Sequence, residues 1–259
     1  MAATMPGLFD LAGKTAVAIG GNSTLGAAMA EGLAAYGARI AIVGRDADKS
    51  LAVCRRIEAA GGTARAFAAD AVSREDLVRA LAEIAAWTSG SGVDILLNCP
   101  GRNSATPFFD ISEEDWDAIM DVNAKSVMLA CQVFGRHMVE RGRGGSIINI
   151  SSASSGPPLS RVFAYSASKA AVNNMTQFLA REFAPAGVRV NAIIPGFFPA
   201  VQNRAILTEE RVASIMGHTP MKRVGEPAEL QGAVVYLASE RASGFVTGSL
   251  LRVDGGFGA

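Results

Sequence analysis

The sequence has little of what metal sites and disulfide frameworks require. It contains only three cysteines and two histidines among 259 residues. Cys54, Cys99 and Cys131 lack the short spacings of zinc ligands, and three cysteines are too few for a disulfide framework. We therefore expect no metal site, and we expect reduced thiols, which fit a cytoplasmic location.

Neither sign of charge is in excess. Lysine and arginine together number 24, as do aspartate and glutamate, so the formal net charge is +0. Without a basic surplus, nucleic acid and anionic membranes are not expected as partners. Runs long and apolar enough to cross a bilayer are also missing, and the first residues lack the basic and apolar regions of a signal peptide. The expected partner is instead a small molecule.

Strand-like apolar runs alternate with helical patterns along the whole chain. Strands are predicted at residues 14–20, 39–43, 64–68, 93–98, 146–150, 188–194 and 244–254. Helices are predicted at 27–37, 47–60, 74–87, 112–138, 163–184 and 227–238. This alternation predicts an α/β protein: one Rossmann-type domain over residues 1–259, with a doubly wound parallel sheet of about seven strands and helices on both faces. Residues 197–223 read as irregular and are predicted to form a substrate lid.

A turn of small residues follows the first predicted strand. Its members are Gly20, Gly21, Asn22, Ser23, Thr24, Leu25 and Gly26. Small residues let the backbone approach a pyrophosphate, and the following helix start offers amide donors. The turn therefore favours a dinucleotide site, although two glycines alone also fit an ordinary tight turn between a strand and a helix.

Polar residues follow three further strands. Arg45 comes after the second strand, where an arginine can meet the 2′-phosphate of NADP(H); NAD(H) remains an alternative because Asp46 follows. Asp70, followed by Ala71, is placed to accept from an adenine amino group or to cap a helix. Asn98 ends the fourth strand, at the edge where open α/β sheets bind ligands.

Tyr165 and Lys169 are the candidate proton-transfer pair. Their spacing of four places both side chains on one face of a helix, and an ammonium near a phenol lowers the phenol's pKa. Ser152 follows the strand at 146–150, where its hydroxyl can hold a carbonyl or alcohol oxygen. Taken alone, such a Tyr–Lys spacing is more typical of an exposed helix face. Asn123, inside a helical pattern, marks either a tolerated surface residue or a local bulge.

Together these residues resemble the short-chain dehydrogenase/reductase family over nearly the whole chain. The matching positions are Gly20 and Gly26 of the glycine motif, Asp70, Asn98, the tetrad Asn123, Ser152, Tyr165 and Lys169, then Pro195–Gly196 and Val253–Gly256. The resemblance implies hydride transfer between a nicotinamide and a carbonyl or secondary alcohol. It also implies cofactor contacts at Pro195, Gly196 and Phe198, and a homotetramer (or homodimer) formed through the helix before the last strand and the C-terminal segment.

The resemblance also implies a role for each tetrad residue. Tyr165 is the acid in reduction and the base in oxidation. Lys169 lowers the pKa of Tyr165 and holds the nicotinamide ribose. Ser152 hydrogen-bonds the substrate oxygen, and Asn123 anchors a water that links Lys169 to solvent.

A narrower resemblance concerns the C-terminal third. Pro195–Pro199, followed by Gln202, Asn203 and Arg204, resembles family members that act as D-mannonate oxidoreductase, or fructuronate reductase. The fork of Arg204 can hold a uronate carboxylate, or the side chain can simply be solvated. The alternatives are a 3-oxoacyl thioester, a polyol or a steroid-like ketone as substrate, or a non-catalytic NADP(H)-sensing module.

Three positions depart from the family pattern. Thr24 replaces the middle glycine, Cys99-Pro100 replaces Asn-Ala before Gly101, and Ala200 replaces a threonine that contacts the nicotinamide carboxamide. We expect them to alter cofactor contacts rather than the chemistry.

Overall fold

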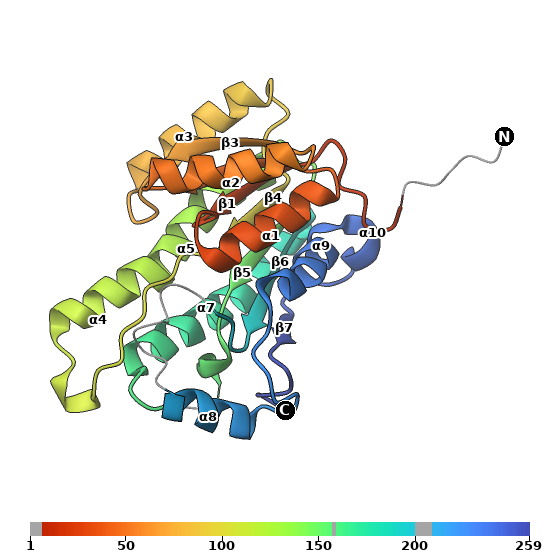
Figure 1. Ribbon diagram of the computed structural model, residues 1–259. Helices are drawn as coiled ribbons and strands as arrows, with labels where there is room; N and C mark the ends of the chain where they lie inside the picture. Colours follow the sequence, from red (N-terminus) through yellow and green to blue (C-terminus); the bar gives the residue numbers. More distant parts are fainter. Residues whose placement is uncertain (1–6, 157–158, 200–208) are drawn as a thin grey trace.

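The computed structural model describes residues 7–156, 159–199 and 209–259. Within these residues a seven-stranded parallel sheet has the order β3-β2-β1-β4-β5-β6-β7 (Figure 1). The strands are β1 Thr15–Ile19, β2 Arg39–Gly44, β3 Thr63–Ala68, β4 Ile95–Asn98, β5 Gly145–Ile150, β6 Val188–Pro195 and β7 Leu250–Val253. The predicted Rossmann-type fold is confirmed.

Helices cover both faces of the sheet (Figure 1). They are α1 Thr24–Ala35, α2 Ala47–Ala59, α3 Arg74–Trp87, α4 Glu113–Met120, α5 Ser126–Ala130, α6 Arg136–Arg141, α7 Phe163–Phe183, α8 Glu209–His218, α9 Gln231–Ala238 and α10 Glu240–Ser243. Residues of α1, α2 and α9 share one buried cluster with the sheet, and residues of α3, α5, α6 and α7 share the other.

The two faces of β1 show why the strands read as continuous apolar runs. All five of its residues are buried. Ala16 and Ala18 belong to the cluster with α1, while Val17 and Ile19 belong to the cluster with α3 and α7. A parallel strand between two helical layers has no solvent face, so its sequence does not alternate between apolar and polar residues.

The order of the strands reverses beside β1. β1 pairs with β2 on one side and with β4 on the other, in parallel register. The chain therefore leaves these neighbouring strands toward opposite faces, which opens a crevice at their carboxyl ends. The polar strand ends noted in the sequence lie at this edge.

The predicted helix at 112–138 is interrupted. π-helical turns occupy Asp121–Lys125 and Cys131–Gly135, separating α4, α5 and α6. Asn123 lies in the first of these turns, which agrees with the local-bulge interpretation of this residue rather than the surface one. A π turn holds one residue more than an α turn, so it changes the direction of the side chains that follow.

Two sequence expectations need correction near the C-terminus. Residues 197–223 are not irregular throughout, because α8 spans Glu209–His218 and lies near the C-terminus (Figure 1). The last strand does not begin at residue 244: β7 starts at Leu250, after a turn in which Gly248 has a φ of +75°. A left-handed residue ends an extended run, so the apolar residues before Gly248 form a loop.

No helix in residues 7–156, 159–199 or 209–259 is both long and apolar enough to cross a membrane.

Candidate active site

The turn between β1 and α1 is too tight for larger residues at two glycine positions. Gly20 has a φ of +71°, and a Cβ on Gly26 would lie less than 3.0 Å from the carbonyl oxygen of Gly20. Ser23 closes the turn: its Oγ donates to the Gly20 carbonyl at 2.8 Å and accepts from the Gly26 amide at 3.2 Å. Thr24 begins α1, so it needs no left-handed backbone. The backbone amide groups of the first turn of α1 therefore face the crevice.

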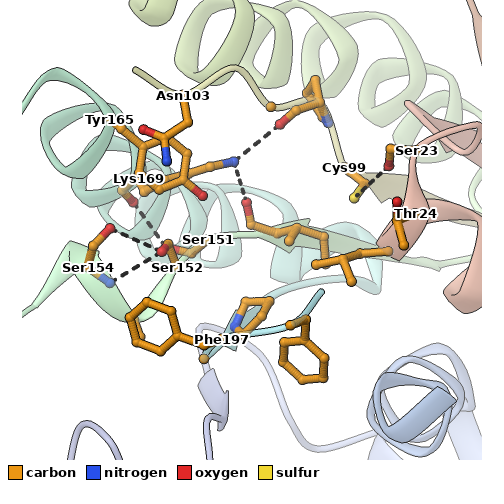
Figure 2. Close-up of a pocket in the computed structure, with 18 of the residues that line it drawn as sticks. Ser23, Thr24, Cys99, Asn103, Ser151, Ser152, Ser154, Tyr165, Lys169 and Phe197 are labelled. Carbon is orange, nitrogen blue, oxygen red and sulfur yellow. Dashed lines mark hydrogen bonds between the residues drawn. The ribbon is translucent and has the colours of Figure 1, made fainter. Parts of the chain in front are cut away.

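A cavity of about 500 Å³ lies at the carboxyl ends of the central strands (Figure 2). Many residues predicted to contact cofactor or substrate line it. They are Asn22, Ser23, Thr24, Leu25, Arg45, Ser152, Tyr165, Lys169, Pro195, Gly196 and Phe198. The structure thus brings together residues that lie far apart in the sequence, within a volume typical of ligand sites.

Tyr165 and Ser152, two of the predicted catalytic residues, line the cavity together (Figure 2). Burial raises the pKa of the Tyr165 hydroxyl, and a hydrogen bond with Ser152 opposes that rise. The Ser152 Oγ also lies 3.0 Å from the Ser154 Oγ and accepts from the Ser154 amide at 3.3 Å. The hydroxyls of Tyr165 and Ser152 therefore lie together in the cavity, where both can reach a single carbonyl oxygen.

Lys169 is 2% exposed, and its ammonium is turned toward two backbone carbonyls. Nζ donates to the oxygen of Ile150 at 2.9 Å and to that of Pro100 at 3.2 Å. Burial lowers the pKa of Lys169 to about 8. Nζ lies 5.9 Å from the centre of the Tyr165 ring. The expected lowering of the Tyr165 pKa by Lys169 stays a prediction, because the causes of the Tyr165 shift found here are burial, Ser152 and Cys99.

Asn123 is buried and does not line the cavity. Its Oδ1 accepts from the Arg102 amide at 2.7 Å, while Nδ2 donates to the Arg102 carbonyl at 2.9 Å and to Ser168 Oγ at 2.9 Å. Ser168 Oγ in turn donates to the carbonyl of Tyr165 at 2.7 Å. The side chain of Asn123 therefore ties the loop after β4 to the helix that carries Tyr165.

Arg45 and Lys49 line the end of the cavity next to β2 and α2. The Arg45 side chain is 74% exposed, and its nearest ionic partner is Asp70, with NH1 to Oδ2 at 3.9 Å. Exposed pairs at such distances contribute little, so the guanidinium is available to an anionic ligand. Asp46 caps α2 through the amide of Lys49.

Asp70 and Ala71 follow β3 outside the lining of the cavity. Asp70 Oδ1 accepts from the Val72 amide at 3.1 Å, and α3 is capped by Ser73 instead. The helix-cap alternative for Asp70 is therefore wrong, while its contact with adenine stays a prediction.

Asn98 does not line the cavity with its side chain. It is fully buried, and Nδ2 donates to Asn149 Oδ1 at 2.9 Å, while Asn149 donates to Thr176 at 3.0 Å. The amide is directed into the core because Asn98 pairs in register with Ile19 and Asn149, whose side chains point to the α7 face.

Several lining residues were not singled out in the sequence. They include Asn103, Ser154, Leu159, Val162 and Lys49, whereas Cys99 was predicted to alter the cofactor contacts. The burial of the Cys99 thiol raises its pKa, and its Sγ lies 3.8 Å from Ser23 Oγ. For Asn103, the only sequence signal was its position beyond the carboxyl end of a predicted strand. Arg204 and Ala200 lie outside the described residues.

Metal ions in proteins are held by groups of histidine, cysteine, aspartate and glutamate side chains. In the described residues, none of these side chains gather in groups of three or more that could hold a metal ion.

Comparison with known proteins assigns the chain to a family. The family model described as "Enoyl-(Acyl carrier protein) reductase" matches residues 19–258. The chain belongs to the short-chain dehydrogenase/reductase family. It is an oxidoreductase, and enzymes of this family transfer a hydride between a nicotinamide and a carbonyl or alcohol.

Three relatives cover almost the whole chain. "Uncharacterized oxidoreductase UxuB" of Bacillus subtilis (strain 168) is 42% identical, with 96% of each chain covered. The 5-keto-D-gluconate 5-reductase of Escherichia coli (strain K12) is 35% identical, covering 97% of this chain and 98% of the relative. The crystal structure of a gluconate 5-dehydrogenase from Burkholderia cenocepacia J2315, in complex with NADP and tartrate, has a TM-score of 0.90 and 35% identity, with 96% of each chain covered. Two of these three relatives have gluconate-type names, and the narrower resemblance to D-mannonate oxidoreductases is not supported.

Proposed function

We propose that this short-chain dehydrogenase/reductase uses NADP(H) to interconvert the ketone and secondary alcohol of a sugar acid. The observation that carries the proposal is that a single cavity contains both the predicted catalytic hydroxyls and an exposed guanidinium. It joins the Ser152 and Tyr165 hydroxyls at one end to the exposed guanidinium of Arg45 at the other.

The residues at the β1–α1 turn fit a dinucleotide. Gly26 has no room for a Cβ against the Gly20 carbonyl, so backbone atoms alone form the floor of the turn beneath the start of α1. Arg45 adds positive charge where the 2′-phosphate of NADP(H) would lie, whereas the ammonium of Lys49 is paired with Asp46 at 2.8 Å. A relative of known structure is in complex with NADP, which supports the same preference. NAD(H) remains the alternative.

In our proposal Tyr165, Ser152 and Lys169 have different roles in the reaction of a bound substrate. The nicotinamide, when bound, supplies or accepts the hydride. Tyr165 donates its phenolic proton to the carbonyl oxygen in reduction and takes it back in oxidation. The raised pKa of Tyr165 keeps the phenol protonated at neutral pH, which suits the reductive direction. Ser152 donates a hydrogen bond to the same oxygen, and the positive charge of Lys169 stabilises the phenolate as it forms.

The sugar-acid class rests on the relatives and on the polar lining near Tyr165. Ser152, Ser154 and Asn103 offer hydrogen bonds to a hydroxylated chain, which a steroid-like ketone would not use. We assign the carboxylate to Arg204 in the predicted lid at 197–223. D-Fructuronate and 5-keto-D-gluconate are both six-carbon 5-keto acids that differ in configuration at one carbon. Both are therefore candidate substrates.

The test is the consumption of reduced cofactor, with NADPH and NADH in parallel. The substrates are 5-keto-D-gluconate, D-fructuronate, a 3-oxoacyl thioester and a 3-ketosteroid. We expect turnover with NADPH and one or both keto acids. Turnover only with the thioester or the steroid would contradict the sugar-acid proposal, and tight NADPH binding without any turnover would favour the sensing module.

We also propose a cytoplasmic homotetramer, which sedimentation would distinguish from a homodimer.

A further inference from the structure

The amide of Asn103 has no hydrogen-bond partner within the part of the protein that the structure describes. Its Oδ1 is buried without a partner, and no described residue bonds its Nδ2. Buried polar atoms of native proteins are nearly always paired, so an unpaired amide calls for a functional explanation. Asn103 lines the same cavity as Tyr165 and Lys169 (Figure 2).

The loop that carries Asn103 is held on both sides of this residue. The preceding residue, Arg102, is bonded through its amide and its carbonyl to Asn123. Further along, the Thr106 amide donates to the Arg161 carbonyl at 3.0 Å. The backbone around Asn103 is therefore fixed relative to α7, and the amide is presented to the cavity at a set place.

The same contacts fix Asn103 relative to the reacting groups. Asn123 also bonds Ser168, whose hydroxyl bonds the carbonyl of Tyr165. Lys169 bonds the carbonyl of Pro100 at the start of the loop. A substrate whose carbonyl oxygen meets Tyr165 and Ser152 therefore has its neighbouring carbon atoms within the same cavity as the free amide. An amide carries donors and an acceptor, which is the complement of a hydroxyl group.

We propose that Asn103 is a specificity-determining residue that hydrogen-bonds a hydroxyl group of the substrate beside the reacting carbonyl. This inference rests on the proposed function. It adds a reason why the enzyme would prefer polyhydroxylated acids. A ketone without neighbouring hydroxyls leaves the amide unpaired and so loses affinity in the transition state.

The test compares two keto acids that differ in their hydroxyl groups. 5-Keto-D-gluconate carries hydroxyls next to the ketone, whereas 5-oxohexanoate has the same carboxylate and 5-ketone without them. In Asn103→Leu we expect kcat/KM for 5-keto-D-gluconate to fall about tenfold, the size of one lost hydrogen bond. The inhibition constant of 5-oxohexanoate against 5-keto-D-gluconate is expected to stay within about twofold of the wild-type value, because that ligand makes no bond to Asn103.

Two further variants separate a local effect from damage to the fold. Asn103→Ala removes the same amide without adding bulk, so the same selective loss is expected. Ser104→Ala changes the next residue of the loop, which does not line the cavity, and is expected to keep wild-type kinetics. The dissociation constant of NADPH, measured by fluorescence, is expected to remain unchanged in all three variants.

The outcomes distinguish this inference from the proposed function. Equal losses for the two keto acids, wild-type kinetics in both Asn103 variants, or weakened NADPH binding would overturn the role of Asn103 while leaving the sugar-acid activity intact. A wild-type enzyme that binds NADPH but reduces no sugar acid would overturn the proposed function, and this inference with it.

Discussion

The side chain of Asn123 holds the backbone of Arg102 at both its amide, 2.7 Å away, and its carbonyl, 2.9 Å away. Because Asn123 lies in a π-helical turn and also bonds Ser168, this one amide connects the loop after β4, the α4–α5 junction and α7.

Replacing Asn123 tests this connection. We expect Asn123→Ala to lower the free energy of unfolding by about 2 kcal/mol, because buried partners on Arg102 and Ser168 are left unpaired. Urea denaturation measures the change. Asn103→Ala is the matched control: it loses no bond within the described protein and should differ from wild type by less than about 0.5 kcal/mol. Equal stability of the two variants would argue against the connection.

Tyr165→Phe tests the proton transfer. The hydroxyl is the only group removed, so we expect kcat to fall by about 10² to 10⁴ while the dissociation constant of NADPH stays the same. Tyr36→Phe removes a hydroxyl from a ring that is half exposed and outside the cavity, and it should keep the wild-type rate. A Tyr165→Phe enzyme with the wild-type rate would contradict the assignment.

Lys169 gives a pH-dependent stability. Its pKa is lowered by burial from 10.5 to about 8, so between these values the unfolded chain binds a proton that the folded protein does not. Stability contributed by this site therefore increases as the pH rises from about 8 to 10.5. We expect wild type to gain up to about 3 kcal/mol relative to Lys169→Met across that window. Urea denaturation at several pH values measures it, and a constant difference would exclude the shift.

Gly26→Ala and Gly232→Ala form a matched pair of helical substitutions. A Cβ at Gly26 would meet the Gly20 carbonyl, whereas a Cβ at Gly232, in α9, meets nothing within 4 Å. We expect the first to lower the free energy of unfolding by about 2 kcal/mol, and the second to raise it by about 0.5 kcal/mol through helix propensity. Thermal or urea denaturation measures the change in the free energy of unfolding, including its sign, for both variants. NADPH binding should weaken only in the first variant.

Arg45→Ala tests the cofactor preference. We expect the KM for NADPH to rise about tenfold and the KM for NADH to stay unchanged, because only NADPH has a 2′-phosphate. The effect should shrink at high salt, since Arg45 is exposed. Arg55→Ala, on the exposed side of α2, is the control. An equal change in the KM for NADPH and for NADH would contradict a role of Arg45 in cofactor preference.

By itself, the sequence determined the class of fold, the strands that carry the site, the glycine turn and the pairing of Ser152 with Tyr165. These depend on local patterns, namely apolar runs, glycines and a helical spacing of four, together with the rule that parallel strands end at one edge of the sheet.

Only the tertiary structure decided where individual side chains point. Asn98 turns into the core because its register beside Ile19 and Asn149 gives it the α7 face. Lys169 turns to the carbonyls of Ile150 and Pro100. Asn103 reaches the cavity because contacts with distant residues fix its loop, and no local pattern records such contacts.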